Sequence, residues 1–135
     1  MSASGHRPQV GVGVIFVRDG RVFLGQRLGP LGGGTWGSAG GHLEDGESLE
    51  DCARREALEE LGVVVGDVRY LCVSNIIAYG RHYVDIGDQE PELLEPDSFA
   101  QSGWLPLESP PEPLFQAVWY ALDSLKTGRH YYSGN

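Results

Sequence analysis

The chain of 135 residues is 41% hydrophobic and carries 19 acidic against 10 basic residues, a net charge of −9 at pH 7. This length predicts one compact domain over 1–135, with a flexible polar leader at 1–9 and a polar tail at 127–135. Proteins that follow a long nucleic acid usually carry a basic face, and this composition gives no sign of one. No apolar stretch is long enough to span a membrane or to form a signal-peptide core, so we expect a cytoplasmic protein without a membrane partner.

The first part of the chain predicts an antiparallel hairpin. Val10 to Val17 and Val22 to Gln26 are rich in β-branched and apolar residues and flank the turn signal Asp19-Gly20. A glycine-rich loop follows at 28–35. Arg27 stands at the mouth of this loop, where it either contacts a phosphate group of a ligand or is an ordinary exposed arginine.

A helix is expected over 49–61, because its residues are strong helix formers and no proline interrupts them. Ser48 is a good N-cap, and Asp51 three residues later gives a variant of the capping box. Gly62 follows the last turn, where a left-handed cap suits a residue without a Cβ atom. Both ends of the helix are therefore marked in the sequence.

The helix carries acidic residues on its weakly apolar side. Glu56 and Glu60, four residues apart, share that side with Cys52 and Ala57, and Glu59 adjoins them. Ionised carboxylates on an inward face are unfavourable unless they are paired or bind a metal, and hard divalent cations prefer such oxygen ligands. The alternative is a solvated acidic stripe that pairs with the arginines at 54 and 55.

The loop before the helix supports the metal interpretation. Gly40-Gly41 lets the backbone run close to a ligand, and the Gly40 carbonyl can serve a cation. His42 is more typical of a structural histidine than of a metal ligand. The acidic run at 44–47 lacks the ligand spacing of a calcium-binding EF-hand loop. Cys52 and Cys72 are expected to be reduced and structural.

Strand signals dominate the second half of the chain. Strands are expected at 63–75 and 81–86, on either side of a turn at Tyr79-Gly80. His82 and Tyr83 are candidates to face a ligand cleft, and the alternative is that His82 is a half-buried histidine of an ordinary strand.

A short strand at 102–105 and a C-terminal helix complete the chain. Several prolines exclude a helix before Leu114, after which apolar residues recur at helical spacing through Leu125. Three aromatic residues of this region are expected in the core, in preference to a base-stacking platform: Phe115, Trp119 and Tyr120.

The segment from Gly41 to Val63 matches the pattern GX5EX7REUXEEXGU at every fixed position, where X is any residue and U an aliphatic one, here Ala57. The matched positions are Gly41, Glu47, Arg55, Glu56, Glu59, Glu60, Gly62 and Val63. The chain therefore resembles the Nudix hydrolase family. The stretches Val22 to Arg27 and Trp36 to Glu47 are also similar to its MutT-like branch, which hydrolyses nucleoside triphosphates.

This resemblance implies an α/β protein with the Nudix fold, an α/β/α sandwich around a mixed β-sheet. It also implies a Mg²⁺ cofactor, with Mn²⁺ as a substitute, and attack by water on a phosphorus atom of a diphosphate linkage. The implied metal ligands are Gly40, Glu56, Glu59 and Glu60. The implied catalytic residues are Glu56, Glu59, Glu60, Arg55 and Glu47, the last two fixing the helix carboxylates through an ion pair. The implied substrate contacts are Arg27, Gly40 and Gly41.

The first functional hypothesis is a MutT-like enzyme that converts a nucleoside triphosphate, such as an oxidised or non-standard purine nucleotide, to a monophosphate and pyrophosphate. The partner is then a small nucleotide. The second keeps the enzyme class but takes ADP-ribose, a nucleotide sugar, a dinucleoside polyphosphate or a capped RNA end. The third is a nucleotide-binding sensor that has kept the fold without catalysis. The sequence does not fix the oligomeric state, and a homodimer is compatible with it.

Two features depart from the family pattern. Ala39 stands where a proline commonly precedes the two glycines. The strand that contains Tyr83 is expected to stop early, as though residues between Ile86 and Asp88 were missing. Glu92 and Glu95 in the acidic loop that follows are either a further metal ligand or base, or part of a solvated loop.

Overall fold

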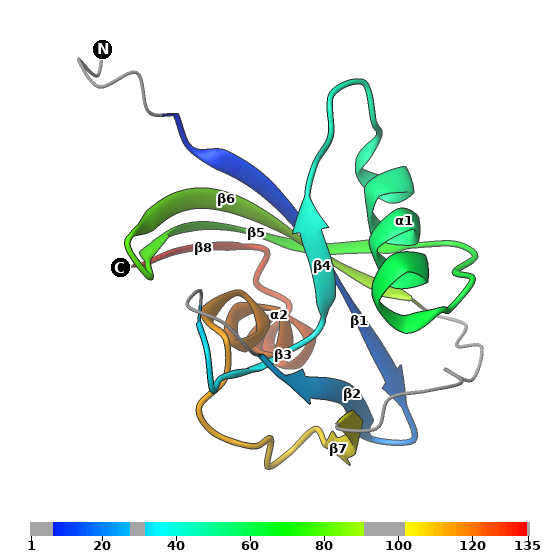
Figure 1. Ribbon diagram of the computed structural model, residues 1–135. Helices are drawn as coiled ribbons and strands as arrows, with labels where there is room; N and C mark the ends of the chain where they lie inside the picture. Colours follow the sequence, from blue (N-terminus) through cyan, green and yellow to red (C-terminus); the bar gives the residue numbers. More distant parts are fainter. Residues whose placement is uncertain (1–6, 28–31, 91–101, 135) are drawn as a thin grey trace.

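The computed structural model describes residues 7–27, 32–90 and 102–134 (Figure 1). The two helices are α1 (Leu49–Leu61) and α2 (Gln116–Thr127). The strands are β1 (Gln9–Arg18), β2 (Arg21–Gln26), β3 (Trp36–Gly37), β4 (Ala39–His42), β5 (Arg69–Ala78), β6 (Arg81–Glu90), β7 (Ser102–Pro106) and β8 (Tyr131–Gly134). Neither helix in this described part is long and apolar enough to cross a membrane.

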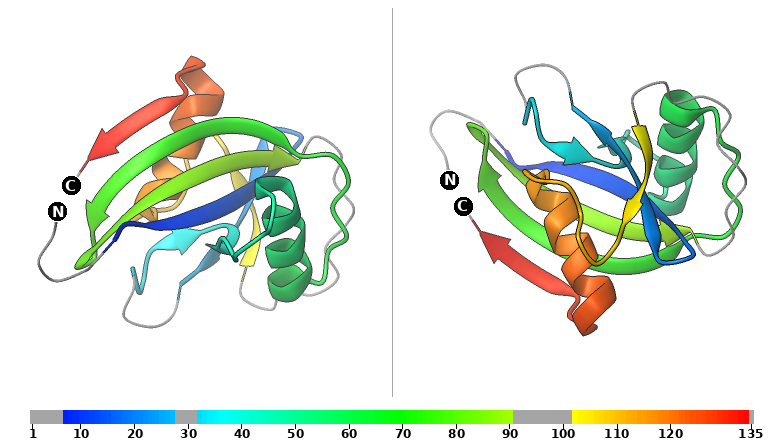
Figure 2. Two further views of the ribbon diagram at one scale, coloured as in Figure 1. Left: turned by 90° about the horizontal axis from the view of Figure 1, so that it is seen from above. Right: turned by 90° about the horizontal axis from the view of Figure 1, so that it is seen from below.

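The strands form one mixed sheet. Its path runs β3-β2-β1-β6-β5-β8, while β4 pairs with β1 and β7 pairs with β2. β1 is parallel to β6 and β5 is parallel to β8, whereas the other pairs are antiparallel. The two helices lie on opposite faces of this sheet, as the two views of Figure 2 show. The predicted α/β/α sandwich is therefore confirmed.

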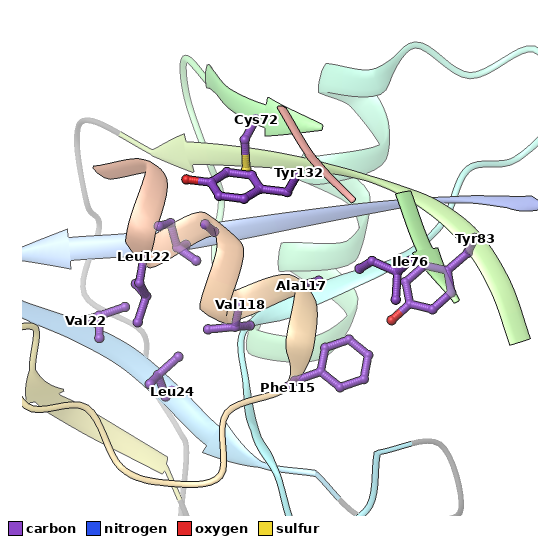
Figure 3. Close-up of a cluster of buried hydrophobic side chains, with 12 residues drawn as sticks. Val22, Leu24, Cys72, Ile76, Tyr83, Phe115, Ala117, Val118, Leu122 and Tyr132 are labelled. Atoms are coloured by element: carbon purple, nitrogen blue, oxygen red, sulfur yellow. The ribbon is translucent and has the colours of Figure 1, made fainter. Parts of the chain in front are cut away.

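Each helix has its own core against the shared sheet. Ile15 of β1 belongs to the cluster on the α2 side, with Ile76 and Val118 (Figure 3). Its neighbours Val14 and Phe16 belong to the second cluster, with buried residues of α1. Successive side chains of a strand point to opposite faces, so the alternation along β1 supplies both cores.

The predicted ends of α1 are confirmed. The Asp51 amide donates to the Ser48 side chain at 3.0 Å, and Gly62 takes a left-handed conformation with φ of 68°. The Asp51 carboxylate pairs with Arg54 at 3.1 Å, so its side chain turns along the helix. The predicted hairpin is also confirmed, since β1 and β2 pair across Asp19-Gly20.

The prediction that the strand after Tyr83 stops near Ile86 is wrong. β6 runs without a break to Glu90 and pairs with β1 over its whole second half. Gly87 is buried in the sheet, where a Cβ atom would lie 3.1 Å from the sulfur of Cys72. A residue that is a weak strand former is therefore kept in the strand by close packing. Glu92 and Glu95 lie outside the described residues.

The prediction of a polar tail at 127–135 is also wrong. Thr127 ends α2, and residues Tyr131–Gly134 form β8 at the edge of the sheet, beside β5. Tyr132 is only 3% exposed and stacks on Tyr120 with ring centroids 4.8 Å apart. This aromatic contact with α2 fixes a segment that composition alone assigned to a tail.

Three smaller predictions need correction. Gln9 belongs to β1 and not to the leader, whose residues 1–6 are not among the described ones. β5 begins at Arg69, because the residues from Val63 to Val68 cross the α1 core without pairing. Trp119 is 51% exposed, whereas Phe115 is buried as predicted.

Candidate active site

Two carboxylates of α1 lie against the glycines of β4. The Gly40 amide donates a hydrogen bond to Oε1 of Glu60 at 2.7 Å. A Cβ atom on Gly41 would overlap the Glu56 carboxylate, so only glycine leaves that group its place. The structure thus brings together four of the residues that the sequence singled out, from one helix and one strand.

Arg55 ties these carboxylates to the loop before the helix. Its guanidinium donates to both oxygens of Glu47, at 2.7 and 3.1 Å, and to Glu56 Oε1 at 2.7 Å. It also reaches Glu59 at 3.3 Å and the His42 carbonyl at 3.1 Å. A planar guanidinium presents several donors in a fixed geometry, which suits this multiple pairing. His42 therefore contributes its backbone carbonyl to the site.

The alternative of a solvated acidic stripe describes only part of the helix. The Glu59 side chain is 58% exposed, but that of Glu56 is 13% exposed. Arg54 turns away from this group, because it contacts Asp51 and the Gly66 carbonyl. The largely buried Glu56 carboxylate therefore does not belong to a solvated stripe, and the pair of Arg54 with Asp51 is separate from it.

Electrostatics keep Glu47 ionised. The hydrogen bonds from Arg55 lower the pKa of Glu47 to about 2, against the opposing effect of partial burial. The same pairing raises the pKa of Arg55 further above its ordinary value. The ion pair is therefore charged on both sides at any pH near neutrality.

The pKa of Glu60 is shifted upward, in contrast to that of Glu47. Burial raises its pKa, the Gly40 amide opposes this, and the neighbouring charges of Glu56 and Glu59 raise it further. Like charges held close together favour a bound cation, since a cation offsets both the repulsion and the loss of hydration.

The donor set fits a hard divalent cation in its chemistry. Carboxylate oxygens of Glu56, Glu59 and Glu60 and the Gly40 carbonyl are ligands of the kind that Mg²⁺ prefers. Within the described residues, no three acidic, histidine or cysteine side chains already surround one point. Glu56 is hydrogen-bonded to Arg55 and Glu60 to Gly40, so a cation would take over part of these interactions.

Arg27 lies beside the same group of residues. Its guanidinium sits over the Phe115 ring, 4.1 Å from the centroid. Its positive charge lowers the pKa of Glu60, which places Arg27 within electrostatic reach of the acidic cluster. This position is compatible with the predicted phosphate contact and also holds Arg27 by a cation–π interaction.

A cavity opens on the other side of the glycines. It has about 740 Å³ of empty space, part of it open to solvent, and is lined by residues of β1, β4, β6 and α2. Tyr83 lines it, as one of the two sequence alternatives predicted, whereas His82 is exposed and contacts Asn75 at 2.8 Å. Asp85 also lines the cavity and was missed, although it lies two residues after Tyr83 and so on the same face of the strand.

The sequence profile of the NUDIX domain matches residues 6–130. The chain belongs to the Nudix family. In the crystal structure of the MutT NUDIX hydrolase from Burkholderia pseudomallei, 99% of the chain aligns with 89% of this one, at 36% identity and a TM-score of 0.78. The MutT-like assignment and the Nudix fold are thereby confirmed.

Curated relatives extend the similarity to several activities. The chain is 30% identical to an oxidized purine nucleoside triphosphate hydrolase of Danio rerio over 112 residues, which is 78% of this chain and 69% of that protein. It is 50% identical to an RNA pyrophosphohydrolase of Caulobacter vibrioides over 58 residues, which is 43% of this chain but only 33% of that protein.

The chain is accordingly a Nudix hydrolase that acts on phosphoric anhydrides, in substrates built on a nucleoside diphosphate. Nudix hydrolases generally use divalent metal cations and act on small nucleotides. The particular nucleotide and the particular cation have to be inferred from the residues of the site.

Proposed function

We propose that this Nudix hydrolase converts a purine nucleoside triphosphate, including oxidised or non-standard forms, to the monophosphate and pyrophosphate in the presence of Mg²⁺. One observation supports this most strongly: Gly40 and Gly41 lie between a cluster of carboxylates and a cavity lined by residues of the sheet and of α2. A nucleotide could therefore place its phosphates at the carboxylates while its base enters the cavity.

In this proposal Glu56, Glu59, Glu60 and the Gly40 carbonyl hold Mg²⁺, or Mn²⁺ in its place. When bound, the cation neutralises phosphoryl oxygens and lowers the pKa of a water molecule. Arg55 and Glu47 keep the carboxylates in position, since their ion pair connects the helix to the preceding loop. Arg27 binds a phosphate oxygen. The oxygen of a water molecule forms the new P–O bond and its proton is released to solvent, while the anhydride P–O bond breaks and pyrophosphate leaves.

A second candidate is hydrolysis of a 5′-triphosphate or cap at an RNA end. The 50% identity to an RNA pyrophosphohydrolase over 58 residues favours including it. The net charge of −9 disfavours a long RNA strand, because phosphate tracking usually needs basic side chains. ADP-ribose, nucleotide sugars and dinucleoside polyphosphates complete the set of alternatives. Cytoplasmic location and homodimer formation also stay predictions, to be checked by fractionation and by light scattering.

A substrate panel tests the proposal. Deoxy- and ribonucleoside triphosphates, oxidised guanine nucleotides, ADP-ribose, dinucleoside polyphosphates and 5′-triphosphorylated RNA are incubated with Mg²⁺, and then with a chelator in its place. Monophosphate and pyrophosphate from a purine triphosphate are the expected products. If only ADP-ribose is hydrolysed, with release of AMP, then ADP-ribose replaces the triphosphate as the proposed substrate. If no compound is hydrolysed, a nucleotide sensor is favoured.

Glu60→Gln separates catalysis from binding. The amide keeps the size of the side chain but weakens a metal ligand, so we expect kcat to fall by about a hundredfold or more while the protein stays folded. Glu108→Gln, which changes an exposed carboxylate after β7, is the matched control and should leave kcat unchanged. An unchanged kcat in Glu60→Gln would remove this residue from the proposed mechanism.

A further inference from the structure

The cavity is lined on one side by apolar side chains and on another by the glycines of β4. Ile15 of β1 and Phe115, Val118 and Ala121 from the α2 region supply apolar surface. Gly40 and Gly41 of β4 also line it, so the cavity shares these residues with the carboxylate cluster. A flat ring that enters from the phosphate side would pack between the sheet and the start of α2.

Tyr83 brings an unsatisfied polar atom to this cavity. Its side chain is buried, with 8% of the residue exposed, and its hydroxyl has no hydrogen-bond partner within the described part of the protein. Figure 3 shows the ring beside Ile76, with the hydroxyl pointing from β6 toward Phe115 and the start of α2. Buried hydroxyl groups are nearly always hydrogen-bonded, so this one indicates a missing ligand or ordered water.

Asp85 lies two residues further along β6, on the same face as Tyr83. Its carboxylate lies over two glycines of β1, because a Cβ atom on Gly11 would be 3.0 Å from Oδ1 and one on Gly13 would be 3.9 Å from Oδ2. Glycines at both positions leave the space that the carboxyl group and a ligand would share.

The surroundings of Asp85 favour its protonated form. Burial, followed by the charge of Asp88, raises the pKa of Asp85 to about 7. Arg27 also faces this region, since its charge acts on Tyr83. A protonated carboxyl group donates one hydrogen bond and still accepts others, whereas an ionised one only accepts.

We propose that Asp85 and Tyr83 form the part of the substrate site that selects a nucleobase by its hydrogen-bonding edge, through the carboxyl group of Asp85 and the hydroxyl group of Tyr83, which can both donate and accept a hydrogen bond. This inference rests on the proposed function, because it takes the ligand to be a nucleotide. Purines match such a partner, since adenine presents an N–H donor beside a ring-nitrogen acceptor and guanine presents an N–H beside a carbonyl. A purine without exocyclic groups lacks this pair.

Binding of monophosphates tests the inference without requiring turnover. The dissociation constants of AMP, GMP and purine riboside 5′-monophosphate are measured by titration calorimetry with the full chain. We define the preference as a ratio of two dissociation constants. The constant of purine riboside 5′-monophosphate is divided by that of AMP or GMP, whichever binds more tightly. We expect a preference of about ten or more for the unaltered protein, because a buried polar site disfavours a ligand that leaves it unpaired. A smaller preference, or no binding of AMP and GMP, would overturn the inference.

Two substitutions then separate the neutral carboxyl group from other roles. Asp85→Asn keeps one donor and one acceptor, so the preference should fall by less than about fivefold. Asp85→Leu keeps the branching of the side chain but replaces both oxygens by methyl groups and forms no hydrogen bond, so the preference should fall by about fivefold or more. If Asp85→Leu keeps the preference, Asp85 does not contact the nucleobase. If Asp85→Asn loses it, the contact is made by an ionised carboxylate.

Folding of each variant is checked by circular dichroism and thermal melting. If Asp85→Leu does not fold, Asp85→Ala replaces it with the same expected loss. Tyr83→Phe removes only the hydroxyl oxygen and should lower the preference by about threefold, whereas no change would exclude Tyr83 from the subsite. Because the readout is binding, a protein that binds as expected but hydrolyses no triphosphate would disprove the proposed function and leave the subsite intact.

Discussion

Gly40 and Gly41 are neighbours in the chain, but a side chain on each would meet different atoms. On Gly41 it would meet the end of the flexible Glu56 side chain, whereas on Gly40 it would lie 2.7 Å from the backbone carbonyl oxygen of Val12. We therefore expect Gly41→Ala to displace the Glu56 carboxylate and lower kcat by about a hundredfold, because small misplacements at a reacting centre have large effects. Its free energy of unfolding should change by less than about 1 kcal/mol.

Gly40→Ala is the matched comparison. The new Cβ atom would clash with backbone atoms of β1, which cannot move aside as a flexible side chain can, so this variant should lose both stability and activity. Urea unfolding and steady-state kinetics on the substrate that the panel identifies measure the two effects. Gly41→Ala with full activity would show that the position of Glu56 against β4 does not matter for the reaction.

Arg55 permits a second residue-level prediction. A lysine at this position has one ammonium group, which cannot bind both oxygens of Glu47 and also reach Glu56 and the His42 carbonyl. In the proposed mechanism Arg55 orients metal ligands, and we therefore expect Arg55→Lys to lower kcat by about 10- to 100-fold. Arg54→Lys is the control, because Arg54 pairs with Asp51 outside the site. Equal activity of the two variants would contradict the prediction.

At the same scale, the sequence predicted the acidic cluster and named Tyr83 as a candidate for the cleft, but it did not predict Asp85. Glu56 and Glu60 are four residues apart in one helix, so local geometry places them together. Asp85 meets Gly11 and Gly13 only because β6 runs parallel to β1, with Asp85 opposite Gly11. Pairing of strands so distant in the chain has no local signature, so an isolated acidic residue in a strand gave no signal of its own.

At the level of elements, α1 and the first hairpin were predictable because their stop signals are local. Ser48, Gly62 and Asp19-Gly20 each act on the residue next to them. β8 and the end of β6 depend instead on contacts with other elements, namely Tyr132 against Tyr120 and Gly87 against Cys72. Tertiary packing overrode the local composition in both segments.

β8 carries the third prediction, since its two tyrosines differ in burial. Tyr132 is 3% exposed and its hydroxyl donates to Asp123 at 2.7 Å, whereas Tyr131 is 59% exposed. Tyr132→Ala should lower the free energy of unfolding by about 3 to 5 kcal/mol, as buried aromatic truncations do. Tyr131→Ala should change it by less than about 0.5 kcal/mol. Similar losses in urea unfolding would show that β8 is held by strand pairing and not by the Tyr132 contact.

For the whole molecule, buried acidic groups make stability depend on pH. The pKa of Asp85 and that of Asp88 are each raised from 3.8 to about 7, mainly by burial. The folded protein then binds more protons than the unfolded chain between about pH 4 and 7, so its free energy of unfolding falls as pH rises through this window. The pairing of Glu47 acts in the opposite direction, but only below the ordinary pKa of 4.5 and toward about 2.

Asp88→Asn tests this balance. Asp88 is 5% exposed and its Oδ2 atom has no hydrogen-bond partner among the described residues, so ionisation leaves a buried charge without compensation. A shift of this size corresponds to at most about 4 kcal/mol. Burial is the main cause of the shift at Asp85 and persists in this variant, while the part due to the Asp88 charge is removed. We therefore expect Asp88→Asn to be more stable than the unaltered protein by about 1 to 3 kcal/mol at about pH 8, with little difference at about pH 4. Urea unfolding at both pH values measures the change, with Asp67→Asn, an exposed carboxylate, as the charge-matched control. A constant difference between Asp88→Asn and the unaltered protein at both pH values would show that Asp88 does not titrate on unfolding, and the loss of stability toward alkaline pH would then belong to Asp85 and Glu60.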